Sequence, residues 1–313
     1  MAAIQQPTFT RYLLAKKSLD DRSLNRHVYG VLARKLAKTP AQQSVRLLEL
    51  GAGCGTMVTR LIEWGLLRSA RYTALDSRPG FVDSTCAYLA EWAEKWDYQF
   101  DCSHPYHVRL ERGQNLIHLD LRQEALADYL QAAEQSLAST DVLIAHAFLD
   151  LVDLPTTLPA LIESMQPGGY LYLTLNFDGQ TIFEPAYEPA LQKRILDSYH
   201  ARMDERQVDS QPSGDSRTGR RLMSSLVEAG LPLLAAGSSD WVVYPGEQGY
   251  IEDEQVVLEH VLDTIAANVG PGPDLAAADL QRWLQNRREL VASGRLIFIA
   301  HQLDVLAQKP PVG

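Results

Sequence analysis

The sequence predicts an α/β protein with a doubly wound, mostly parallel sheet. Short apolar runs recur along the first half of the chain, and stretches with helical spacing separate them. The runs are VRLLEL (45–50), RYTALD (71–76), NLIHLD (115–120), DVLIAHA (141–147) and GYLYLTLNF (169–177). Nearly continuous apolar runs are typical of parallel strands that helices cover on both faces. Repeated strand–helix units of this kind wind right-handed and fill both sides of a sheet.

The intervening and later segments favour helices and two further strands. Apolar spacing predicts helices over 56–67, from Pro79 onward and over 155–165. In the second half it predicts helices over 188–206, 217–229, 250–268 and 274–292, with strands over 231–244 and 295–306. The first 40 residues read as one or two helices.

These elements suggest a core with additions. We expect a helical lid over 1–40, a core formed by 41–180 and 217–313, and helical insertions at 181–216 and 249–293. The insertions carry no recognisable motif. We expect them to influence substrate choice or oligomerisation, which leaves a homodimer open.

Composition narrows the function classes. The 313 residues are 46% hydrophobic and 22% charged, with a net charge of −10. Nucleic-acid binders usually present a basic face, so the acidic balance argues against that class. No apolar run approaches the ~20 residues that span a bilayer, so we expect no membrane partner. Three cysteines without metal-site spacing suggest reduced thiols, no metal centre and a cytoplasmic protein.

The segment LLELGAGCGT (47–56) is the most informative motif. Its glycines, at 51, 53 and 55, follow a buried strand and precede a helix. Glycine permits positive φ and close approach of a ligand to the backbone, and a helix N-terminus offers free N–H groups. Thr56 stands where a dinucleotide fingerprint requires glycine, and no phosphate-loop lysine follows. The carboxylate of Glu49 suits a positively charged amine on the ligand. The alternative interpretation of the whole motif is an ordinary tight turn between strand and helix that binds no ligand.

Acidic residues end the next two strands. A carboxylate at Asp76 can accept two hydrogen bonds from a ribose diol, although aspartate is also a common cap. Asp120 can accept from an adenine amine while Leu121 packs on the ring. Asp120 is equally suited to capping the next helix, and the two roles are compatible.

The order ELGAGCG, LD, HLDL, DVLIAHAFLDLVD and MQPGGYLYL resembles the class I S-adenosylmethionine-dependent methyltransferase family over about residues 45–177. The resemblance implies a seven-stranded, Rossmann-like sheet with one antiparallel strand and S-adenosylmethionine as cofactor. The expected cofactor-binding positions are Glu49, Gly51, Ala52, Gly53, Gly55, Asp76, Ser77, Asp120, Leu121, Ala145 and His146.

Catalytic residues are harder to assign, because methyl transfer mainly requires positioning and needs a base only when the acceptor must lose a proton. His146 is the candidate base; packing on the cofactor is its alternative role. Arg22 in the lid is a candidate partner for the methionine carboxylate. His146-Ala147-Phe148-Leu149 replaces the Asn-Pro-Pro-Tyr clamp for planar amines, which favours a small-molecule acceptor. A Rossmann-type oxidoreductase and a catalytically silent cofactor-binding protein are the alternatives.

Overall fold

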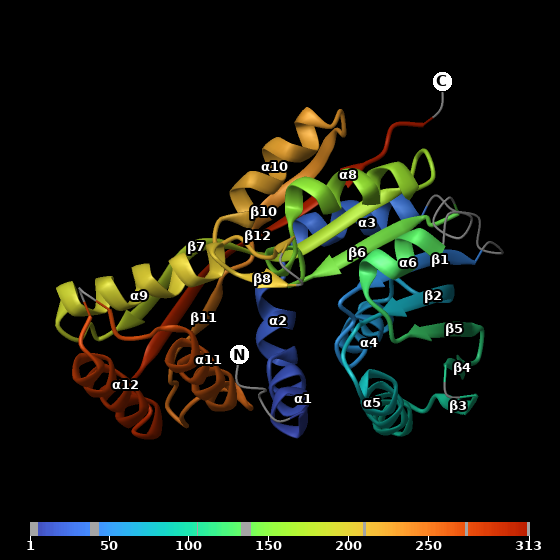
Figure 1. The fold of residues 1–313 in the computed structure, drawn as a ribbon. Helices are drawn as coiled ribbons and strands as arrows, with labels where there is room; N and C mark the ends of the chain where they lie inside the picture. The colour runs from blue at the N-terminus through green and yellow to red at the C-terminus, as the bar shows by residue number, and fades with distance from the viewer. Residues whose placement is uncertain are drawn as a thin grey trace.

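The computed structural model describes residues 6–37, 44–104, 106–132, 139–208, 211–272 and 275–311. Its main sheet follows the order β10-β12-β7-β6-β1-β2-β5-β4-β3 (Figure 1). The parallel centre consists of β7 (Tyr170–Glu184), β6 (Val142–His146), β1 (Val45–Leu50), β2 (Ser69–Leu75) and β5 (Asn115–Arg122). All five predicted strands of the first half are therefore present and adjacent.

The predicted final strands complete the sheet. Strand β12 (Ile297–Gln308) lies antiparallel to both β7 and β10 (Leu233–Ser238). Strand β10 consequently points in the same direction as the parallel centre. The predicted doubly wound, seven-stranded core with one antiparallel strand is confirmed. The run expected as one strand over 231–244 is divided into β10 and β11 (Trp241–Val243), both paired with β12.

The sheet is larger than predicted, because a hairpin extends its β5 edge. Strands β3 (Gln99–His104) and β4 (His107–Arg112) are antiparallel to their neighbours. In β4 the alternate residues Val108 and Leu110 are buried while their neighbours face outward. This period of two is the pattern of a half-buried strand. The segment lacks a continuous apolar run, and for that reason the sequence does not predict these two strands.

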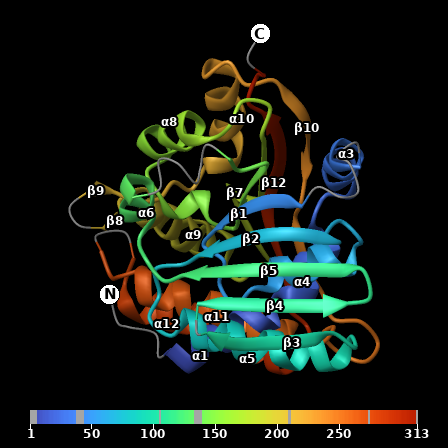
Figure 2. The same cartoon turned by 90° about the vertical axis from the view of Figure 1, so that its right-hand side faces the viewer.

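Helices cover both faces of the core. One face packs against α3 (Arg26–Leu36), α4 (Thr56–Glu63) and α5 (Phe81–Lys95), and its buried side chains include Leu47 and Tyr72. The other face packs against α6 (Leu126–Ala132), α8 (Leu154–Ser164) and α10 (Thr218–Glu228), and includes Leu48 and Leu50. Adjacent residues of β1 thus enter different cores, as alternation along a strand requires. Beyond the helices, the face of β2, β5, β4 and β3 is open (Figure 2).

Helices from the second half of the chain form a second lobe around the far ends of β7 and β12. Helices α9 (Pro189–Asp204), α11 (Glu254–Asn268) and α12 (Ala277–Ala292) pack there around a separate apolar cluster that includes Trp283 and Phe183. Figure 1 shows this lobe beside the main sheet, with α1 (Gln6–Ala15) and α2 (Lys17–Ser23) between the two parts. The short pair β8 (Gln207–Val208) and β9 (Gln211–Pro212) follows α9.

Helices α2 and α3 belong to the core rather than lying on it. Leu19, Leu24, Val28 and Leu32 are all fully or almost fully buried. The carboxylate of Asp304 accepts hydrogen bonds from the backbone N–H groups of Asn25 and Leu175, each at 2.8 Å. Removing this segment would expose apolar core, so we expect its deletion to unfold the protein. Residues 1–5 and 38–40 of the predicted lid lie outside the described residues.

No helix within the described ranges is long and apolar enough to cross a bilayer. Cys86 on α5 and Cys102 on β3 form a disulfide, whereas Cys54 is free and buried. The expectation of three reduced thiols is therefore wrong for two of them. Their proximity depends on the β3–β4 hairpin, which was not predicted from the sequence.

Candidate functional site

The glycine loop lies at the carboxyl edge of the sheet, where β1 is flanked by β2 on one side and β6 on the other. Open α/β sheets bind ligands at such a switch point. Gly51, Gly53 and Gly55 have φ of 67°, 65° and 78°. These left-handed conformations explain the glycines, since other residues adopt them at a cost. The loop delivers the chain into α4, whose N-terminus faces the same crevice.

Asp76 is directed at this loop. Its Oδ2 accepts a hydrogen bond from the Gly53 N–H at 2.9 Å. Its Oδ1 accepts from the backbone N–H and from Nε of Arg78, at 2.9 and 3.0 Å. The carboxylate is buried and fully engaged within the chain. Asp76 therefore lies beside the glycine loop, as the sequence predicts. The sequence does not indicate that the Arg78 side chain binds the Asp76 carboxylate.

Side chains close the loop on three sides. A Cβ built on Gly51 would collide with the ring of Phe148, and one on Gly53 would lie 3.5 Å from Leu13. Nη2 of Arg78 donates to the Gly53 carbonyl at 2.8 Å. The guanidinium also lies over the ring of Phe9, 5.0 Å from its centroid. The loop is closed in this structure, and a ligand there requires Phe148, Leu13 and Arg78 to move.

Glu49 lies behind the loop in a buried position. Its Oε2 accepts a hydrogen bond from the Tyr72 hydroxyl at 2.8 Å. Burial raises the pKa of Glu49 to about 8, although the Tyr72 hydrogen bond and the Arg60 charge oppose the shift. The carboxyl is therefore largely protonated at neutral pH in the closed form. A cationic group placed next to it would favour its ionised form.

His146 ends β6 in the same crevice, but both of its ring nitrogens are engaged. Nδ1 lies 2.9 Å from the Thr174 hydroxyl and Nε2 lies 3.1 Å from Oδ2 of Asp20. Burial lowers the pKa of His146 to about 4; the Asp20 hydrogen bond opposes this shift and the Arg60 charge reinforces it. The neutral imidazole is thus held between β7 and α2. This geometry favours a positioning role over that of a free base.

Asp20 connects the N-terminal helices to the crevice. Its Oδ2 accepts from Nζ of Lys16 at 2.6 Å, and its Oδ1 accepts from the Trp241 indole at 3.1 Å. Burial opposes ionisation, but Lys16 and His146 hold the pKa of this carboxyl below its usual range. The charge is compensated inside the protein, as a buried carboxylate requires. The network holds α2 against the end of β6 and the first half of β7.

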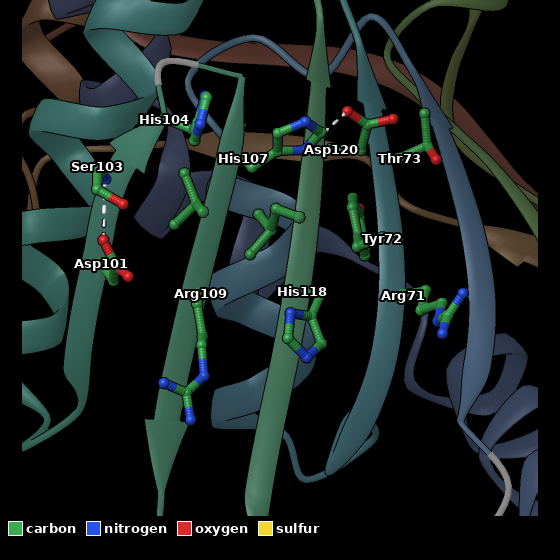
Figure 3. A pocket seen from close by; sticks show the side chains of 12 residues that line it. Arg71, Tyr72, Thr73, Asp101, Ser103, His104, His107, Arg109, His118 and Asp120 are labelled. Atoms are coloured by element: carbon green, nitrogen blue, oxygen red, sulfur yellow. Dashed lines mark hydrogen bonds and ion pairs between the residues drawn. The ribbon is translucent and has the colours of Figure 1, made fainter.

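Four predicted site residues are not brought to the loop. Arg22 donates to the Val242 carbonyl at 2.8 Å and pairs with Glu254, so it faces the second lobe. Ser77 is exposed in the turn after β2. Asp120 lies in register with Thr73, three residues before Asp76, and pairs with His107 at 3.4 Å on the open sheet face (Figure 3). The N–H of Leu121 donates to the Tyr106 carbonyl.

The remaining predicted positions lie at or beside the crevice. Ala52 is buried and its N–H donates to the Leu75 carbonyl at 3.0 Å. Ala145 is buried in β6, in register with Leu50 at the end of β1. The Ala52 hydrogen bond attaches the glycine loop to β2. Ala145 packs in the sheet next to the end of β1, where the loop begins.

The open face in Figure 3 is a groove of about 550 Å³ between polar side chains of β2, β5, β4 and β3. Histidines alternate there with arginines and acids, and Arg109 pairs with Glu111. Alternate buried and exposed residues along β4 make this the solvated side of a half-buried sheet. The groove is separate from the glycine loop.

Neither a protein-family model nor a curated protein matches the chain. Among solved structures, the chain is similar to YcgJ from Bacillus subtilis, with 10% identity over 91% of this chain and 100% of that one, at a TM-score of 0.43. Phosphoethanolamine N-methyltransferase 2 from Haemonchus contortus shares 10% identity over 91% and 53% of the two chains, at 0.41. Geranyl diphosphate C-methyltransferase from Streptomyces coelicolor shares 11% over 90% and 81%, at 0.39.

Proposed function

We propose that the chain is an S-adenosylmethionine-dependent methyltransferase with a small-molecule acceptor. The observation that carries the proposal is the pairing of a left-handed glycine loop at the switch point with the Asp76 carboxylate aimed at its backbone. Bare backbone admits an adenosyl group closely, and the carboxylate matches a ribose diol. Thr56 and Glu49 disfavour a pyrophosphate-containing cofactor at the same loop.

The residues present fit this cofactor once the loop opens. Gly51 and Gly53 would provide a cradle of bare backbone once Phe148 and Leu13, which lie against them, withdraw. Asp76 would hold the ribose after Arg78 withdraws, and Glu49 would face the methionine amine. When bound, the cofactor supplies a methyl group on a positively charged sulfur. The protein's task is to hold the acceptor in line with that group and to exclude water.

Calorimetric titration with S-adenosylhomocysteine tests the proposal. We expect saturable binding by the wild type, and Asp76→Ala should weaken it by about 1–3 kcal/mol because charged hydrogen bonds are lost. Asp83→Asn on α5 is a matched control for charge, because this exposed residue lies outside the loop. Undiminished affinity in Asp76→Ala would remove the ribose assignment.

A parallel titration with NADH separates the classes of function. Binding of NADH with no response to S-adenosylhomocysteine would favour an oxidoreductase. Binding of S-adenosylhomocysteine without methylation of any acceptor in a mass-spectrometric metabolite screen would favour a catalytically silent binding protein.

A further inference from the structure

The groove on the open sheet face has no role in the proposed function. It has a volume of about 550 Å³ and is lined by residues of β2, β5, β4 and β3 (Figure 3). Small-molecule sites commonly have volumes of about 300–1,000 Å³. Along β2, the lining residue nearest to the glycine loop is Thr73, three residues before Asp76. The groove is therefore a candidate site for a second ligand, distinct from the cofactor.

The strand register aligns basic side chains in one row across this face. Arg46 on β1 is the partner of Arg71 on β2, and Arg71 is the partner of His118 on β5. His118 is in turn the partner of Arg109 on β4. Residues directly opposite one another project from the same side of a sheet, with about 4.8 Å between neighbouring strands. Three arginines and a histidine thus cross four adjacent strands, and the last three of them line the groove.

The two ends of this row are paired with acids, but its centre is not. Nε of Arg46 lies 3.3 Å from the Asp141 carboxylate, and Arg109 pairs with Glu111. Among the residues that the structure describes, no acceptor forms a hydrogen bond or an ion pair with the Arg71 guanidinium. Like charges repel one another over a spacing of one or two strands. An anion bound at Arg71 would relieve this repulsion and supply the missing counter-ion.

Two further donors lie next to Arg71 on the same face. One is the imidazole of His118 on the neighbouring strand, and the other is the hydroxyl of Thr73, two residues further along β2. Successive side chains of a strand alternate between its faces, so Thr73 and Arg71 share one side. Neither donor has a hydrogen-bond partner within the described ranges. Arg71 and His118 are exposed and Thr73 is half-buried, so a ligand can reach all three.

Two acids also line the groove, and both are engaged. Asp101 on β3 accepts a hydrogen bond from the Ser103 N–H at 2.9 Å. Asp120 on β5 pairs with Arg122 at 2.7 Å and with His107 at 3.4 Å. These partners compensate the carboxylate charges, while oxygens that face the groove can still accept from hydroxyl groups. The groove therefore suits a polar molecule that carries an anionic group at one end.

We propose that this groove binds a small phosphate ester and holds its phosphate on Arg71, His118 and Thr73. The three terminal oxygens of a phosphate ester match these three donors, whereas a carboxylate offers only two oxygens. The planar fork of a guanidinium binds phosphate through two parallel hydrogen bonds. The rest of the ligand extends toward β4 and β3, where Asp101 and Asp120 accept from its hydroxyl groups. The site lies apart from the glycine loop and does not depend on methyl transfer.

Titration of the full chain with inorganic phosphate and with glycerol 3-phosphate tests the site, with backbone amide NMR signals as the readout and the ionic strength held constant. We expect saturable binding of both probes, with shifts centred on 71–73 and 118–120. Arg71→Gln should weaken binding at least tenfold and His118→Gln at least threefold, because charged hydrogen bonds are lost. Acetate should bind at least tenfold more weakly than phosphate, and equal binding of the two would overturn the assignment to phosphate.

Arg202→Gln provides the matched control, because Arg202 is also an exposed arginine but lies on α9, paired with Glu205 at 2.8 Å. This variant should bind phosphate like the wild type. Absence of saturable phosphate binding, equal binding by Arg71→Gln, or shifts confined to the glycine loop at 51–55 would overturn the site. Binding of inorganic phosphate without binding of glycerol 3-phosphate would overturn the assignment to an ester. If the Arg71→Gln chain does not fold, His118→Gln and the position of the wild-type shifts decide the outcome.

Discussion

Replacing Arg78 with methionine should tighten the binding of S-adenosylhomocysteine. In the closed form, Nε of Arg78 donates to Asp76 at 3.0 Å and Nη2 donates to the Gly53 carbonyl at 2.8 Å. A ribose that takes the Asp76 carboxylate must first displace this guanidinium. The free energy needed to displace Arg78 therefore weakens ligand binding by the wild type. Without the Arg78 side chain this free energy is not spent, so the ligand should bind more tightly.

The two contacts set the size of the effect. A buried hydrogen bond to a charged group contributes about 1.5–3 kcal/mol, whereas an exposed ion pair contributes about 0.2–1 kcal/mol. The Arg78 side chain is 30% exposed, so solvent screens it substantially. We therefore expect a total of about 1–2 kcal/mol, which corresponds to roughly five- to thirtyfold tighter binding.

Isothermal titration of the wild type, Arg78→Met and Arg122→Met measures this difference. Arg122 is a close control, because its Nε pairs at 2.8 Å with Asp120, also two residues earlier in the chain, but away from the glycine loop. Arg122→Met should leave the affinity unchanged. Unchanged or weaker binding by Arg78→Met would show that Arg78 does not compete with the ligand, and the closed-loop interpretation would be wrong.

Three further predictions concern stability. His146, with its pKa lowered to about 4, binds fewer protons folded than unfolded, so its contribution is present above about pH 6.5 and is lost as the pH falls toward 4. The unfolding free energy of the wild type minus that of His146→Asn should therefore drop by about 3 kcal/mol over this interval; a flat difference in urea titrations would contradict it. Gly51→Ala should destabilise by about 1–3 kcal/mol more than Gly113→Ala, because only Gly51 faces Phe148 although both have positive φ; equal melting temperatures would argue against the contact. Asp304→Ala should lower the unfolding free energy by about 2 kcal/mol or more, because two backbone N–H groups lose their acceptor; a wild-type urea midpoint would show that the pairing is dispensable.

The strands and the glycine loop could be predicted because they depend on local properties. Apolar runs mark strands that are buried on both faces, and the three glycines mark a turn whose left-handed φ values other residues adopt at a cost. Asp76 was also accessible to sequence reasoning, since adjacent parallel strands end at the same edge of a sheet. The β3–β4 hairpin has a weaker, alternating pattern, and it escaped prediction together with the Cys86–Cys102 bond.

The sequence by itself determined where the candidate cofactor loop lies and which strand carries its acid. Only the tertiary structure decided what surrounds them. His146 and Asp20 are 126 residues apart in the chain and are hydrogen-bonded in the fold. Leu13 likewise reaches Gly53 from α1, a helix that precedes the loop by a long stretch of chain. Backbone conformation follows from neighbouring residues, whereas the occupancy of a carboxylate or an imidazole depends on side chains that only folding brings within hydrogen-bond distance.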